Sequence, residues 1–153
     1  MFRLETLLSP NLTLCRAQGV SKKRLFDTAA AFIAAAHPGL QEGDIYNSLL
    51  AREKLGSTAL GNGIAIPHCR ISGCEEAIVA LFTLEEGIDF DAPDGRPVDI
   101  LFMLLVPEEA QQEHLNILAG IAQLLNEERF CASLRDAVDN ATLFKNATEF
   151  VLP

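Results

Sequence analysis

One stretch of the chain, residues 52–70, combines side chains and backbone suited to the transfer of an anionic group. His68 follows an apolar Ile-Ala-Ile segment and a proline, so its imidazole should be held at the end of a strand. Histidine is the side chain whose neutral, nucleophilic form is abundant near neutral pH. Arg52 supplies a planar fork of N–H donors that matches a phosphoryl group. Together the two residues suggest phosphoryl transfer to histidine.

A glycine-rich loop precedes the histidine and can bind an anion. Its glycines stand among serine, threonine and asparagine, a composition that lets the backbone turn tightly and direct N–H groups outward. The residues expected to bind phosphoryl oxygens are Ser57, Gly61, Asn62 and Gly63. Turn formation explains Ser57 and Asn62 equally well, so both interpretations stay open.

The segment AREKLGSTALGNGIAIPH, residues 51–68, carries a family resemblance. It resembles the active-site segment of the fructose/mannitol-type enzyme IIA of the bacterial phosphoenolpyruvate-dependent sugar phosphotransferase system, and it is close to the nitrogen-regulatory branch. Later segments also resemble this family, so the resemblance covers almost the whole chain. These segments are residues 90–92, 97–99, 104–107 and 114–115.

The resemblance implies a role for three side chains. His68 would be the phosphorylated histidine and would receive its phosphoryl group from a small phosphocarrier protein of the HPr type. Arg52 matches the family's active-site arginine, and His114 matches a second histidine that hydrogen-bonds the phosphorylated one. Without the resemblance, each histidine is more simply interpreted as structural, His114 as a residue at the rim of the core. No cofactor is expected.

Cysteines near the histidine raise the alternative of a metal site. His68, Cys69 and Cys74 offer three ligands within seven residues. Adjacent side chains point apart on extended backbone and the usual C-x-x-C pair is missing, so we expect no metal. Much of the family has Gly-Lys where this chain has Cys69 and Arg70, and Arg70 keeps a positive charge there. A thiol beside a reactive site also suggests oxidation sensitivity of Cys69, a hypothesis that depends on its exposure.

Bulk properties limit the fold and the partners. A chain of 153 residues with 49% hydrophobic content suits a single domain, residues 1–153, with a substantial core. The net charge of −9 argues against nucleic acid as the main partner and favours a basic protein partner. No signal peptide and no apolar run of membrane-spanning length is visible, so we expect a cytoplasmic protein without membrane insertion.

Two helices are predicted before the histidine. Ser21 can cap the first, whose apolar residues recur at helical spacing until a Pro-Gly pair ends it. The second should span about residues 44–55 and carry Arg52 in its last turn, where the helix dipole alone also favours a basic residue. Glu53 is interpreted either as a salt bridge to a neighbour or as an exposed charge, and the basic run 22–24 as a solvated surface.

The apolar runs 77–84 and 98–106 predict the centre of the fold. Their lack of alternation implies strands covered on both faces by helices, hence an α/β fold with a central sheet, to which the resemblance adds that the sheet is mixed. A short edge strand is expected near residues 12–15, and two short amphipathic helices should close the far face of the sheet. A helix predicted to open at Pro107 has an expected apolar stripe of Leu115, Leu118, Ile121, Ala122 and Leu125.

These observations leave two main functional hypotheses and a weaker third one. In the first, the protein carries a phosphoryl group on His68 and regulates target proteins through its phosphorylation state. In the second, it is a sugar-uptake enzyme IIA that passes the phosphoryl group to a separate fructose or mannitol IIB. In the third, it is a binding module with a vestigial histidine.

Overall fold

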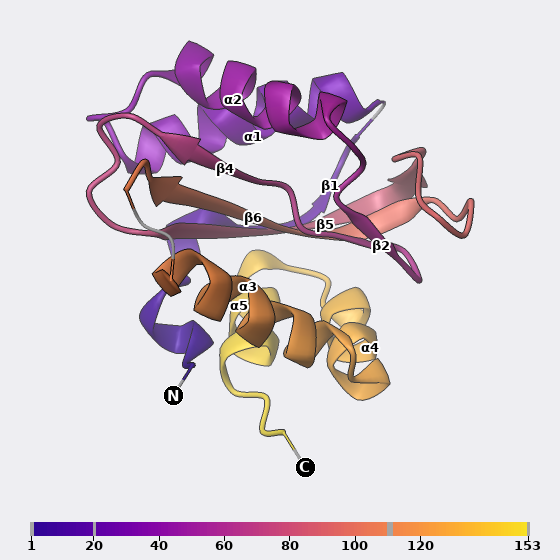
Figure 1. Ribbon diagram of the computed structural model, residues 1–153. Coiled ribbons are helices and arrows are strands. Elements are labelled where there is room, and N and C mark those ends of the chain that lie inside the picture. The colour runs from indigo at the N-terminus through magenta and orange to yellow at the C-terminus, as the bar shows by residue number, and fades with distance from the viewer. Residues whose placement is uncertain (1, 20, 110–111, 153) are drawn as a thin grey trace.

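The computed structural model describes residues 2–19, 21–109 and 112–152, and a six-stranded mixed sheet forms its middle layer (Figure 1). The strand order is β1-β5-β6-β3-β2, and β4 also pairs with β6. The predicted α/β architecture with a mixed central sheet is confirmed. The strands are β1 (Thr13–Ala17), β2 (Ala59–Gly61), β3 (Ile64–Ala65), β4 (His68–Ile71), β5 (Ile78–Ile88) and β6 (Val98–Pro107).

Helices cover both faces of the sheet (Figure 1). The helices α1 (Lys22–Ala36) and α2 (Glu42–Lys54) lie on one face, and α3 (Gln112–Leu125), α4 (Glu128–Asp136) and α5 (Asn140–Thr148) lie on the other. Ser21 caps α1 as predicted, because its side chain accepts a hydrogen bond from the Arg24 N–H. Within the described ranges, every helix is too short or too polar to cross a membrane.

The two longest strands form the core of the sheet. β5 and β6 pair antiparallel, and residues 79–82 and 100–106 are fully buried. Their continuous apolar runs were predicted to be covered on both faces, and the helix layers explain why no alternation with polar residues occurs. β1 pairs only with β5 and forms one edge, as expected for the short strand near the N-terminus.

The chain from β3 to β4 runs along one side of β6 and places the histidine. β3 pairs parallel with β6 at Ile64 and Ile100, and β4 pairs parallel with it at His68 and Leu104. Between them the Pro67 carbonyl accepts the Leu104 N–H at 2.9 Å, so the segment stays attached to β6 through the break between the two strands. His68 therefore sits at a fixed register against the most buried strand.

The prediction for α3 needs two corrections. Pro107 is the last residue of β6, and the two glutamates after it lie in a turn, so they do not form the first turn of the helix. The buried stripe also differs, because Leu115 is 59% exposed whereas Ile117 is 5% exposed. Apolar residues occupy both sides of this helix, and spacing alone does not tell which side meets the sheet. The buried residues of the stripe are His114, Ile117, Ile121, Leu124 and Leu125.

Candidate active site

One ring nitrogen of His68 is hydrogen-bonded to the backbone, and the other takes no part in that bond. His68 is half-buried at the start of β4, and its Nδ1 lies 2.7 Å from the Ile66 carbonyl oxygen. A carbonyl oxygen only accepts, so the proton of the neutral ring is on Nδ1. This tautomer leaves the lone pair on Nε2, which makes Nε2 the nucleophilic atom.

The surroundings of His68 favour the neutral ring. Burial lowers the pKa of His68 and the positive charge of Arg52 lowers it further, while the bond to Ile66 and the negative charge of Glu53 act in the opposite direction. The net effect is a pKa below the ordinary value of 6.5. His68 is therefore in its nucleophilic form at neutral pH.

His114, near the start of α3, lies beside His68 on β4. The ring centroids are 5.5 Å apart with the planes at 74°, an edge-to-face arrangement. His114 is only 8% exposed, and its Nδ1 is buried without a hydrogen-bond partner among the described residues. Burial lowers the pKa of His114, and the neighbouring His68 and Arg70 lower it further. The structure thus brings together the two histidines that the family resemblance singled out.

Arg52 lies in the last turn of α2, as predicted, and its charge acts on His68. Arg52 is half-buried, and its guanidinium donates from Nη1 to the Gly56 carbonyl oxygen at 2.9 Å. This bond anchors the side chain just after the helix and uses only part of its fork of N–H groups.

Ser57 has partners within the protein. Its hydroxyl donates to the Phe90 carbonyl oxygen at 2.7 Å and accepts the Ala59 N–H at 3.1 Å. These bonds fix the segment between α2 and β2, so turn formation, one of the two interpretations left open by the sequence, accounts for this residue.

The glycine-rich turn between β2 and β3 does not meet His68. Gly61, Asn62 and Gly63 have φ values of +97°, +57° and +80°, as a tight turn requires. The Gly63 carbonyl accepts the N–H groups of Asp99 and Ile100 at the start of β6. Ile100 lies four residues before Leu104, which pairs with His68, and four strand residues span about 13 Å.

The groups of this turn are also used within the protein. The Asn62 N–H donates to Asp94 Oδ2 at 2.8 Å, and the Asn62 carbonyl accepts from Arg135 at 2.8 Å. The predicted phosphoryl-binding role of Gly61, Asn62 and Gly63 is therefore not supported by this geometry. Glycine spacing predicted the turn correctly but carries no information about where its N–H groups point.

Residues 6–147 match the family model described as phosphoenolpyruvate-dependent sugar phosphotransferase system, EIIA 2. The chain belongs to this family. The match spans both histidines and the arginine, so the expected family is confirmed over nearly the full length of the sequence.

Relatives within the EIIA 2 family are named nitrogen regulatory proteins. One from Pseudomonas aeruginosa is 48% identical over 145 residues, which are 95% of this chain and 94% of the relative. The crystal structure of nitrogen regulatory protein IIA-Ntr from Neisseria meningitidis matches with a TM-score of 0.87 and 37% identity, covering 95% of this chain and 99% of that one. Mannitol IIA from Escherichia coli matches with a TM-score of 0.75 at 17% identity over 92% and 98% of the two chains, which shows a shared fold.

The environment of Glu53 in this EIIA chain differs from both interpretations of the sequence. Its side chain is 3% exposed, and its carboxylate pairs with Lys22 Nζ at 2.9 Å and accepts from the Thr58 hydroxyl at 2.6 Å. It is neither exposed nor paired with a neighbour on the helix, and Lys22 is not part of a solvated surface. The ion pair joins residues 31 positions apart, which no local pattern could reveal.

The cysteines beside His68 are buried thiols. Burial raises the pKa of the Cys69 thiol to about 12, and it also raises the pKa of Cys74. A thiol with so high a pKa supplies little thiolate. The burial of Cys69 therefore does not support the hypothesis that it is oxidation-sensitive. Among the described residues, no group of three or more histidine, cysteine, aspartate or glutamate side chains is arranged to hold a metal ion.

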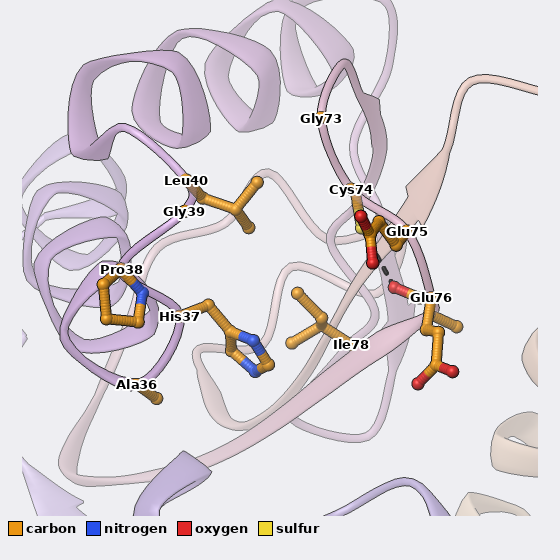
Figure 2. Close-up of a pocket in the computed structure, with 11 residues that line it drawn as sticks. Ala36, His37, Pro38, Gly39, Leu40, Gly73, Cys74, Glu75, Glu76 and Ile78 are labelled. Carbon is orange, nitrogen blue, oxygen red and sulfur yellow. Dashed lines mark hydrogen bonds between the residues drawn. The ribbon is translucent and has the colours of Figure 1, made fainter.

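A cleft of about 430 Å³ lies between the end of α1 and the loop from β4 to β5 (Figure 2). Figure 2 shows the His37 ring beside Ile78, with Glu75 on the opposite wall. None of the three residues that the resemblance singled out is among those that line it. The cleft is therefore separate from the candidate active site.

Proposed function

We propose that this chain is a cytoplasmic phosphoryl carrier that accepts a phosphoryl group on Nε2 of His68 from an HPr-type phosphocarrier and regulates target proteins through its phosphorylation state. Residues 1–153 act as a single domain in this function. The observation that supports it best is the bond from His68 Nδ1–H to the Ile66 carbonyl, because that bond presents a neutral ring with its lone pair on Nε2.

The transfer is a displacement at phosphorus. Nε2 of His68 attacks in line, the new P–N bond forms as the bond between phosphorus and the carrier's own nitrogen breaks, and the carrier's ring recovers that electron pair. The His68 ring acquires positive charge during the step. The Ile66 carbonyl, already bonded to Nδ1–H, stabilises that charge.

Arg52 and His114 stabilise the transferring group. The Arg52 guanidinium has N–H groups beyond the one bonded to Gly56, and a planar fork suits two phosphoryl oxygens. His114 is the second donor, since its ring lies 5.5 Å from that of His68 and its buried Nδ1 lacks a partner among the described residues. A hydrogen bond to the phosphoryl group would satisfy a polar atom that is otherwise costly to bury.

The regulatory role follows from the relatives. The Pseudomonas aeruginosa protein, 48% identical to this chain, is named a nitrogen regulatory protein, and that name supports a regulator more than a step in sugar uptake. Phosphorylation adds a doubly charged group to the surface around His68, so a target protein can distinguish the two states.

The test is the intact mass of the protein after incubation with phosphoenolpyruvate, enzyme I and HPr-type carriers. We expect one acid-labile phosphoryl adduct on the wild type and on the control His37→Ala, and none on His68→Ala. Absence of any adduct while the carriers themselves become phosphorylated would overturn the proposal. If an added fructose or mannitol IIB removes the adduct, the chain serves sugar uptake.

A further inference from the structure

The carboxylate of Glu53 is a buried charge whose hydrogen-bonding capacity is fully used. Besides Lys22 Nζ, it accepts the Thr58 hydroxyl at 2.6 Å and the Thr58 N–H at 3.2 and 3.3 Å from its two oxygens. Burial of a charge is expensive unless it is paired and hydrogen-bonded, and here both conditions hold. The carboxylate therefore has one well-defined position relative to Thr58.

Lys22 is fixed in turn by contacts on its far side. Its Nζ lies 4.7 Å from the centre of the Phe90 ring and 3.2 Å from an oxygen of Asp91. The Lys22 side chain is 18% exposed, whereas Asp91 is 80% exposed, so Glu53 is its better-shielded partner. The ion pair thus ties the first turn of α1 to the last turn of α2.

A series of hydrogen bonds leads from this carboxylate to the reactive imidazole. The Thr58 carbonyl accepts the Ile66 N–H at 3.1 Å. The Ile66 carbonyl then accepts Nδ1–H of His68 at 2.7 Å. Glu53 holds Thr58, Thr58 holds Ile66, and Ile66 sets both the direction of the ring and the nitrogen that carries the proton.

We propose that Glu53 is a positioning residue for His68: through Thr58 and Ile66 it keeps the imidazole in the Nδ1–H tautomer with Nε2 available to the phosphoryl group. The consequence for phosphoryl transfer rests on the proposed function, whereas the orientation of the ring does not. The charges that act on His68 are those of Arg52 and Glu53, both on α2, whereas Arg70 on β4 acts on the neighbouring His114. Glu53 is the negative one among them.

The test uses nitrogen NMR of His68 in the unphosphorylated protein, with phosphoryl acceptance as a second readout. Glu53→Gln keeps the shape but places an amide NH₂ against Lys22 or Thr58, both of which are donors. We expect a mixture of ring tautomers, a lower His68 pKa because a nearby negative charge is lost, and acceptance about ten- to a hundredfold slower. Glu85→Gln, at an exposed position on β5, should change none of these quantities.

A second pair of variants keeps the proposal testable if Glu53→Gln fails to fold. Thr58→Val removes the hydroxyl donor, and Thr58→Ser retains it. We expect a tautomer mixture in the valine variant and the wild-type tautomer in the serine variant. An unchanged Nδ1–H tautomer in both folded Glu53→Gln and Thr58→Val would overturn the proposal. A tautomer change in a protein whose wild type accepts no phosphoryl group would refute the proposed function and leave the positioning role intact.

Discussion

The two ends of β6 differ in how completely their polar groups are hydrogen-bonded. At its first residues, the turn around Gly63 is closed by Asp94, and Asp99 pairs with Arg135 at 2.9 Å. Toward its other end, beside His68, the buried Nδ1 of His114 has no partner among the described residues. The polar groups of the glycine-rich turn are thus bonded within the protein, whereas beside His68 a buried ring nitrogen is left unpaired among the described residues.

The largest effect is expected from a substitution in the turn that is tested for both stability and phosphoryl acceptance. In Gly63→Ala the new Cβ would lie 2.7 Å from Arg135 Nη2 and 2.9 Å from Asp99 Oδ1, at a φ of +80° that strains any other residue. We expect a loss of about 2 to 4 kcal/mol in the free energy of unfolding. Denaturant unfolding measures that loss.

Phosphoryl acceptance decides what the turn contributes. Per folded molecule, Gly63→Ala should accept at the wild-type rate, because the turn lies about 13 Å along β6 from His68. Gly73→Ala is a matched control, since Gly73 also has a positive φ but no atom stands within 4 Å of the added Cβ. If folded Gly63→Ala accepts phosphoryl groups more slowly and Gly73→Ala does not, the turn contributes to the active site.

Arg52 and Lys54 give a second, smaller test at the histidine end. Both are basic residues in the last turn of α2, so both interact favourably with the helix dipole. Only Arg52 is half-buried with its charge acting on His68. We expect Arg52→Ala to slow acceptance about ten- to a hundredfold and Lys54→Ala to leave it unchanged, measured by the rate of adduct formation. Equal effects of the two substitutions would mean that Arg52 contributes only through its interaction with the helix dipole.

The sequence predicted the parts of the fold that local pattern controls. The apolar runs of β5 and β6, the Ser21 cap and the turn around Gly63 were all recognisable from neighbouring residues. The side of α3 that is buried was not, because Leu115 and Ile117 are equally apolar and the choice depends on the sheet beneath.

The candidate site shows the same limit. Periodicity placed Arg52 on a helix end, and resemblance to a family paired His68 with His114. The role of Glu53 depends on Lys22, 31 residues away, and on the hydrogen bonds through Thr58 and Ile66. Such contacts exist only after the helices have packed on the sheet, so no spacing in the sequence predicts them.

The smallest effect expected is that of pH on stability, and it too should differ between the two ends of β6. The pKa values of His68 and His114 are both lowered below 6.5, chiefly by burial. The unfolded chain therefore binds more protons than the folded one near and below pH 6.5, and stability must fall as the pH drops through that value. At the turn, hydrogen bonds from backbone N–H groups lower the pKa of Asp94 below 3.8, so that end contributes only in much stronger acid.

Denaturant unfolding between about pH 5.5 and pH 7.5 checks this assignment. We expect the wild type to lose stability toward the lower pH. The double variant His68→Ala, His114→Leu should lose less over the same range, because neither buried imidazole remains to take up a proton. Asp94→Asn should show the same dependence of stability on pH as the wild type in this range, since the wild-type Asp94 carboxylate stays ionised throughout it. If the double variant loses as much stability toward low pH as the wild type, the two histidines are not the source of the pH dependence.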